Sequence, residues 1–418
     1  MERMETNRDI LDLAGNAGRT LLENGAEIAR VEETMSRIAH HYGAEDDSFF
    51  VLSNGIIATG QDYARASFIP IKGTSLDKVV AVNQLSREVI EFDIPLAEAR
   101  RRLDSIRTMK SKPNWEQVLG SSIGGAAFCL LFGGSMTDCF ASLVAGLVLA
   151  CFVSFVSTPY LSRIASNVLG GLIASLSCLC LYRCGVGDHL SNIIIGTLIA
   201  LVPGVPFTNG IRDLANEDYI AGTTRLLDAM LIFFCIALGL CLALMLDARL
   251  TGGLVELSSM TVDAFTSRGV VQVLAALIGT AGFAVLFGVP RRYYVDCGVC
   301  GAVGWAVYLL LTRSAHLTVV EATVVSATVV AMVSRLQAVW RKCPVTVFLI
   351  CGIFPLVPGA GIFWTSYHLV AGHLVQAVST GFLAVKITVA IALGIILAYE
   401  LYGRRARKRS LRRKLHTS

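Results

Sequence analysis

The sequence predicts an all-α polytopic membrane protein with about ten transmembrane helices, arranged as two inverted five-helix repeats, behind a small soluble α+β domain. Composition is the first reason. Of the 418 residues, 54% are hydrophobic and only 16% are charged, whereas in soluble domains about 25% of residues are charged. The second reason is that apolar runs close to the ~20 residues needed to cross a bilayer recur from residue 117 onward. The third is an internal repeat.

The repeat is visible as matched blocks at one fixed offset in residue number. Leu201–Gly204, with the sequence Leu-Val-Pro-Gly, recurs as Leu356–Gly359, and Ile236–Gly239 recurs at the same offset as Ile391–Gly394. We call this spacing, which relates Leu201 to Leu356, the repeat offset. No insertion separates the blocks, so the second half of the membrane region is interpreted as a copy of the first. A Pro-Gly break inside duplicated apolar segments is typical of transporters whose site lies between the repeats.

The region 1–112 is polar and predicts the soluble domain. An apolar stripe at three- and four-residue spacing indicates one helix, formed by Ile28, Val31, Met35, Ile38 and Tyr42. Short strands are expected at 49–53, 56–60 and 64–70, because turn-type residues separate these runs. Two further helices are expected at 75–93 and 96–110.

The expected spans divide the rest of the chain. They lie near residues 117–133, 137–157, 164–182, 190–208, 226–246, 269–289, 294–312, 317–334, 345–363 and 378–401. This gives a first repeat at 113–247, an amphipathic or loop connector at 248–268, a second repeat at 269–403 and a basic tail at 404–418.

Basic residues predict the orientation. The tail carries eight basic and no acidic side chains, and the loops assigned to the cytoplasm hold eight Arg and Lys against four in the others. Both termini are therefore expected on the cytoplasmic side of the cell membrane. An odd number of spans per repeat makes the second copy cross in the opposite sense. The tail favours contact with anionic lipid rather than nucleic acid.

The sequence gives little reason to expect a metal, a cofactor or catalysis. All twelve cysteines lie between Cys129 and Cys351, mostly inside apolar runs, and the Cys297–Cys300 spacing has no second pair. An enzymatic N-terminal domain, such as a hydrolase, is kept as an alternative of another class. Against it, residues 1–112 lack cysteine, a G-x-S-x-G motif and metal-spaced histidines.

Candidate path residues cluster after the breaks. Prolines free backbone carbonyls that need partners in a membrane, and ionisable residues inside spans tend to be functional. The alternatives are an ordinary cytoplasmic loop for the stretch after residue 208, a boundary position for Asp228 and snorkelling for Lys386. The candidates are Pro203, Gly204, Pro206, Thr208, Asn209, Asp213, Asp218, Gly222, Arg225, Asp228, Pro358, Gly359 and Lys386.

A segment of the soluble region also stands out, at Gly25–Thr34, with the sequence Gly-Ala-Glu-x-x-Arg-Val-Glu-Glu-Thr. Taken alone, Glu27, Arg30 and Glu33 favour a solvated helix face. However, this segment is similar to the N-terminal signature of the threonine/serine exporter family. Pro203-Gly204, followed by Thr208-Asn209, Asp213, Gly222 and Arg225, resembles that family too, and the order of domains fits over nearly the whole chain.

The resemblance implies a function. A member of this family is expected to export small polar amino acids, threonine and serine, driven by the proton gradient. Split relatives are associated with dicarboxylate export, so succinate is the alternative substrate. The expected partners are the small solute, protons and the lipid bilayer, with a homo-oligomer allowed and no nucleic acid. One departure is that His373 stands where the repeat register would place an acidic residue equivalent to Asp218.

Overall fold

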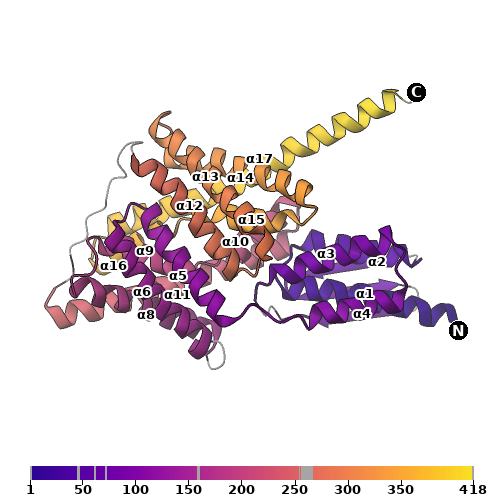
Figure 1. The fold of residues 1–418 in the computed structure, drawn as a ribbon, viewed down its shortest axis with the longest axis horizontal. Coiled ribbons are helices and arrows are strands. Elements are labelled where there is room, and N and C mark those ends of the chain that lie inside the picture. The colour runs from indigo at the N-terminus through magenta and orange to yellow at the C-terminus, as the bar shows by residue number, and fades with distance from the viewer. Residues whose placement is uncertain are drawn as a thin grey trace.

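The computed structural model describes residues 2–44, 48–60, 63–70, 73–157, 161–253, 255 and 267–416. Figure 1 shows a large helix bundle beside a smaller N-terminal part that contains a β-sheet. The last helix of the chain leaves the bundle on the same side as the N-terminal part. The two ends of the chain therefore lie toward one side of the bundle.

Four helices and a small sheet make up the N-terminal part, residues 2–107. The elements are α1 (Glu2–Glu23), α2 (Ile28–His41), β1 (Ser48–Leu52), β2 (Gly55–Gly60), β3 (Tyr63–Phe68), α3 (Leu76–Glu91) and α4 (Leu96–Arg107). The strands form an antiparallel sheet in the order β1-β2-β3, with Val51 opposite Ile56. The stripe on α2 is the buried side of that helix, as its spacing indicates.

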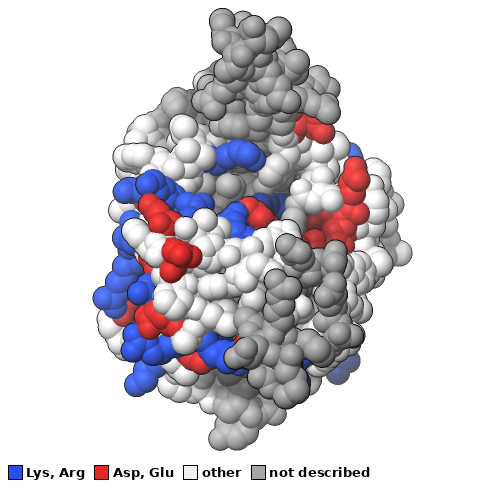
Figure 2. All heavy atoms as spheres, turned by 90° about the vertical axis from the view of Figure 1, so that its right-hand side faces the viewer, with Lys and Arg blue, Asp and Glu red and all other residues white. Residues whose placement is uncertain are grey.

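The outer surface of this part carries both signs of charge. Figure 2 shows Lys and Arg interspersed with Asp and Glu over the face turned away from the bundle. Exposed pairs such as Arg100 with Asp9, at 2.8 Å, belong to this surface. This is the mixed pattern of a solvated face rather than the one-signed patch of a nucleic-acid site.

The bundle contains two series of helices. The first is α5 (Asn114–Leu131), α6 (Met136–Cys151) with the π-helical η1 (Phe152–Ser157), α8 (Arg163–Arg183), α9 (Leu190–Leu198), η2 (Ile199–Leu201), α10 (Gly204–Ala215) and α11 (Tyr219–Thr251). The second is α12 (Ser267–Leu286), η3 (Arg291–Tyr293), α13 (Tyr294–Arg313), α14 (Val319–Arg341), α15 (Val345–Ile353), η4 (Phe354–Leu356), α16 (Gly359–Val370) and α17 (Leu374–His416).

Among the described residues, eight helical segments are long and apolar enough to cross a membrane, and the bent pair of α9–η2 with α10 allows a ninth. This establishes an all-α polytopic membrane protein. Each of the ten expected spans falls on a helix, but α5 is not one of these segments, so the count of ten stays a prediction. Residues 248–251 end α11, and most of the expected connector lies outside the described residues.

Helix boundaries follow the register that the matched sequence blocks define. The segments α9, η2 and α10 begin and end at positions that the repeat offset carries onto the bounds of α15, η4 and α16. The backbone at the two breaks is also alike, with φ −77° and ψ 62° at Pro203 and φ −76° and ψ 52° at Pro358. Equivalent prolines therefore interrupt equivalent helices.

The register also relates α5 to α12, which pack against each other. A Cβ added at Gly124 would lie 3.2 Å from the ring of Phe283, and one added at Gly279 would lie 2.7 Å from the ring of Phe128. These two contacts exchange partners when each residue is moved by the repeat offset. Gly120 lies beside Val285, so contact positions fall along α12 as they rise along α5. The two equivalent helices run antiparallel.

Close helix packing in the bundle depends on glycine, as is common in lipid. A Cβ at Gly239 of α11 would lie 2.2 Å from the carbonyl oxygen of Val168 in α8. We expect Gly239→Ala to force these helices apart and to lower the free energy of unfolding by about 1–3 kcal/mol, seen as a lower melting temperature of the full chain in detergent. The control is Gly15→Ala, where nothing lies within 4 Å of the added atom; an equal loss in both variants would contradict the packing argument.

Candidate functional site

The site is built around the first broken helix. Helix α9 tightens into η2, Val202 is extended with φ −61° and ψ 128°, and α10 restarts at Gly204 with a bend of 63°. Pro203 cannot donate a backbone hydrogen bond, and Pro206 falls in the first turn of α10, where proline is tolerated. The expected span at 190–208 therefore ends earlier, and the polar stretch from Thr208 to Asp213 is helical and buried rather than a loop.

The buried face of α10 is bonded to the N-terminal domain. Oδ1 of Asp213 accepts a hydrogen bond from the backbone N–H of Ile28 at 3.1 Å, and Nδ2 of Asn209 donates to the carbonyl of Gly25 at 2.7 Å. Asp213 and Asn209 are both almost fully buried. The N-terminal end of α2 thus gives its free backbone groups to α10, and a carboxylate is the side chain that suits a helix N-terminus.

Arg225, near the start of α11, completes this contact. Its Nη1 donates to Oδ2 of Asp213 at 2.6 Å, and its Nη2 donates to the carbonyl of Ala26 at 2.9 Å. Both side chains are buried. A buried carboxylate and guanidinium that share their hydrogen bonds with backbone groups form a satisfied pair.

A second buried pair lies beside the first. Arg212 of α10 forms an ion pair with Glu27, and its Nη1 donates to Oγ1 of Thr346 in α15 at 3.0 Å. Its guanidinium also lies over the ring of Tyr399 in α17, 5.6 Å from the centroid. Arg212 therefore links the N-terminal domain, the first broken helix and the second series of helices. We call Glu27, Arg212, Asp213 and Arg225 the junction cluster.

A cavity of about 420 Å³ adjoins this cluster, and we call it the junction cavity. Its polar lining includes Arg225, Asn209, Arg163 and Asp228. Arg163 of α8 and Asp228 of α11 pair across it at 2.9 Å and keep part of their surface exposed. The cavity therefore offers both signs of charge beside a broken helix.

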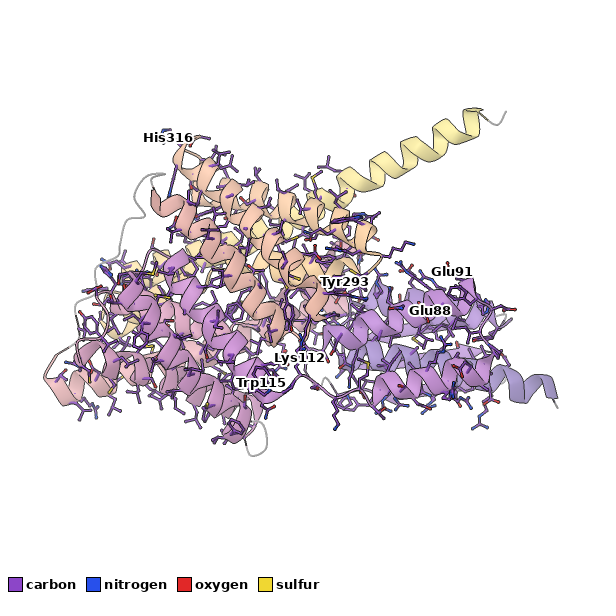
Figure 3. The ribbon with its side chains drawn as sticks, in the orientation of Figure 1. Glu88, Glu91, Lys112, Trp115, Tyr293 and His316 are labelled. Carbon is purple, nitrogen blue, oxygen red and sulfur yellow. The ribbon has the colours of Figure 1, made fainter. Side chains whose placement is uncertain are left out.

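A larger cavity of about 890 Å³ lies between the N-terminal domain and the bundle, and we call it the vestibule. Gly73 and Thr74 line both the vestibule and the junction cavity. Lys112, labelled at the junction in Figure 3, also lines the vestibule and donates to the carbonyl of Val289 and to the hydroxyl of Tyr294. Burial lowers the pKa of Lys112.

The other residues expected from sequence lie at several places. Asp218 is the N-cap of α11, accepting from the N–H of Ala221 at 3.3 Å. Gly222 packs so closely on α10 that a Cβ there would lie 2.9 Å from the carbonyl oxygen of Gly210. Pro358 and Gly359 form the second break. Lys386 is exposed, with its Nζ over the ring of Phe382, and lines neither cavity.

The N-terminal signature divides in the same way. Glu27 is buried in the junction cluster, whereas Glu33 is exposed and pairs with Arg37. Arg30 lies 3.5 Å from both Glu27 and Glu33. Within the described part of the chain, Glu27 is the one of the three that pairs with a residue of the bundle.

Four contributors to the site were not among the sequence candidates: Arg163, Arg212, Thr346 and Tyr399. Arg212 lies next to Asp213 in the polar stretch from Thr208 to Asp213, and this neighbouring position is the sequence feature that could have identified it. The other three sit on helices far away in sequence, and no local pattern marks them.

Glu32 provides a test of the interface by pH. Burial raises the pKa of Glu32, and repulsion from Asp218 raises it further. The hydrogen bond that Oε1 accepts from the N–H of Val51 acts in the opposite direction and lowers the pKa. Because the folded state holds this proton more tightly, its stabilising contribution is complete below the ordinary value near 4.5 and is lost as pH rises through the raised pKa. We expect the difference in melting temperature, Glu32→Gln minus the unsubstituted protein, to become more positive as pH rises from about 4.5 to 7.5. A difference that does not change with pH would contradict this.

The Asp213–Arg225 pair should behave as a coupled unit. Arg225→Gln leaves Asp213 charged and buried, at a cost of about 3–5 kcal/mol in the free energy of unfolding. Combined with Asp213→Asn, the loss should be smaller than the sum of the two single losses. Thermal unfolding of the full chain measures both, and the same cycle on the more exposed Arg163–Asp228 pair should give about 0–1 kcal/mol. Additive losses at Asp213 and Arg225 would show that the pair is not coupled.

Comparisons with known proteins cover nearly the whole chain. Residues 12–247 match the ThrE family model for threonine/serine exporters, and residues 272–400 match a second ThrE model for threonine/serine exporters. The threonine/serine exporter of Corynebacterium glutamicum is 22% identical over 96% of this chain and 83% of its own length. A probable threonine/serine exporter of Mycobacterium tuberculosis is 22% identical over 95% of this chain and 78% of its own length.

A split relative matches the first half. The probable succinate transporter subunit YjjP of Escherichia coli is 23% identical over 57% of this chain and 95% of its own length. No solved structure matches. The two family models together span both series of helices and the N-terminal domain, with its junction cluster, and the chain therefore belongs to the threonine/serine exporter family.

Proposed function

We propose that the protein is a secondary active transporter that exports small polar amino acids, threonine and serine, from the cytoplasm in exchange for protons. The observation that carries the proposal is the junction cavity. It holds the guanidinium group of Arg163 and the carboxylate of Asp228, both of which keep part of their surface exposed. A free amino acid carries one carboxylate and one ammonium group, so this cavity complements both ends of such a solute.

Alternating access is supported by the relation between the two halves. Equivalent helices α5 and α12 run antiparallel where they touch, as expected for repeats that cross the membrane in opposite senses. The two parts of the first broken segment meet at an angle of 63°, whereas the equivalent stretch Val345–Val370, also interrupted by η4 and Pro358, is straight enough to form one span. The two halves thus hold different shapes, which an exchange of roles between the repeats requires.

The N-terminal domain is proposed to control the cytoplasmic opening. It is bonded to α10 through the junction cluster and shares the vestibule wall with the bundle. The basic tail leaves on the same side (Figure 1), which fits a cytoplasmic location for both termini in the cell membrane. The buried carboxylate of Asp213, whose partner Arg225 lines the junction cavity, is the proposed proton acceptor.

Uptake into inside-out vesicles tests the function. With an imposed proton gradient, labelled threonine and serine should enter, and a protonophore should abolish this entry. Arg163→Gln and Asp228→Asn should each reduce threonine uptake by about tenfold or more, since each removes one charge-assisted contact. For succinate, which has no ammonium group, Asp228→Asn should not reduce uptake.

Matched controls are available on the exposed surface of the N-terminal domain. Arg101→Gln and Glu91→Gln remove the same charges from exposed positions and should leave uptake unchanged. Uptake of succinate alone would replace the amino-acid proposal with dicarboxylate export. If folded protein moved none of the three solutes, the exporter proposal would fail.

A further inference from the structure

A cavity of about 410 Å³ lies at the second break, and we call it the second cavity because it pairs with the junction cavity at the first break. Pro358, Ala360 and Gly361 line it, and the repeat offset relates Ala360 and Gly361 to Val205 and Pro206, which line the junction cavity. The two cavities therefore meet equivalent first turns of equivalent half-helices. The other walls are formed mainly by α13 and α14. In Figure 3, His316, which follows the end of α13, marks the end of the bundle away from the N-terminal domain.

The second cavity differs chemically from the junction cavity. Among the described residues, no acidic side chain lines it. Arg313, at the last turn of α13, brings a guanidinium to the wall, and its Nη2 donates to Oε1 of Gln272 at 2.9 Å. Gln272 is buried and neutral, so it fixes the position of the guanidinium without adding a negative charge.

An indole donor lies in the same wall. Trp305 is 7% exposed, and its buried Nε1–H has no hydrogen-bond partner among the described residues. The ring is held in place by Tyr308, stacked at 5.0 Å, and by the edge of Phe132 at 6.1 Å. An indole N–H can only donate, and leaving a buried donor unpaired costs free energy. The ring of Trp305 lines the cavity, and a ligand oxygen that reached this edge of the ring would supply the missing acceptor.

The backbone adds to this donor set. Helix α16, twelve residues long, begins at Gly359, whose N–H donates to the carbonyl of Val357. The next two N–H groups, of Ala360 and Gly361, have no partner within the helix by its geometry and lie at the positive end of the helix dipole. Indole, guanidinium and helix N-terminus all favour an acceptor with negative charge.

We propose that this cavity is a carboxylate-binding site, which receives the carboxylate group of the transported solute at the far side of the bundle. The transport role rests on the proposed function; binding of a small carboxylate does not. The junction cavity recognises both ends of an amino acid, whereas this one recognises the carboxylate end alone. A solute that passes from the first to the second would lose its contact to the ammonium group, which favours release.

Fluorescence of Trp305 reports on the site directly. In full-length protein in lipid nanodiscs, with Trp115, Trp340 and Trp364 replaced by Phe, L-threonine and succinate should each change the emission of Trp305. L-threoninol, which has a hydroxymethyl group in place of the carboxylate, should not. Arg313→Gln should raise the half-saturating concentration by about tenfold or more, whereas Arg249→Gln, at an exposed position, should leave it unchanged.

A second measurement avoids the multiple replacement. In the otherwise unsubstituted chain, Trp305→Phe keeps a ring but removes the N–H, and should weaken equilibrium binding of labelled succinate. Trp340→Phe, at an exposed position of α14, should not. Equal responses to threonine and threoninol, or succinate binding that survives both Trp305→Phe and Arg313→Gln, would overturn the carboxylate site.

The outcomes separate the two proposals. If the vesicles transport threonine but Trp305 does not respond, the carboxylate site is wrong and the exporter stands. If Trp305 responds to carboxylates in a protein that transports none of the tested solutes, the site stands and the proposed function fails.

Discussion

The buried pairing of Asp213 with Arg225 is the interaction on which the junction depends. Two charged side chains in a buried setting are tolerable only when each finds its partner and its remaining hydrogen bonds. Here the backbone of Ile28 and the carbonyl of Ala26 complete them, so neither the N-terminal domain nor α10 is satisfied without the other. Arg212 extends the same constraint to the second series of helices through Thr346 and Tyr399. A shift of α10 must therefore disturb contacts with the N-terminal domain, with α11 and with the second series of helices.

This constraint ties the N-terminal domain to the helix bundle through α10. The half-helix α10 follows a proline break and lacks the continuous hydrogen-bond ladder that would fix its direction. The N-terminal domain supplies that fixation from the side of the tail. The second half-helix, α16, differs at the equivalent positions: Trp364, Tyr367 and His368 stand where α10 has Asn209, Arg212 and Asp213, and the hydroxyl of Tyr367 donates to the carbonyl of Val255 at 3.1 Å. The backbone dihedral angles at the two prolines are alike, but the side chains that contact the two half-helices differ.

The two cavities at the breaks also differ in the charged side chains that line them. The junction cavity has Arg163 paired with Asp228, while the second has Arg313 and the indole of Trp305 without an acidic residue among the described lining. Both cavities have the start of a half-helix in their walls, at positions that the repeat offset relates. The surrounding side chains differ, and under the proposed function this difference would let the junction cavity bind both ends of an amino acid and the second cavity only its carboxylate.

The sequence by itself determined the membrane class, the repeat offset, the positions of both breaks and the two family motifs. These are local properties: apolar content decides where a helix can sit in lipid, and proline decides where its hydrogen bonds stop. Even the helix boundaries followed the repeat register. Tertiary structure alone decided that Glu27 meets Arg212, that Asp213 meets the start of α2 across 185 residues of sequence, that Lys386 is exposed, and that Trp305 and Arg313 share a cavity. Such partners are selected by packing between distant helices, and no spacing within one helix records them.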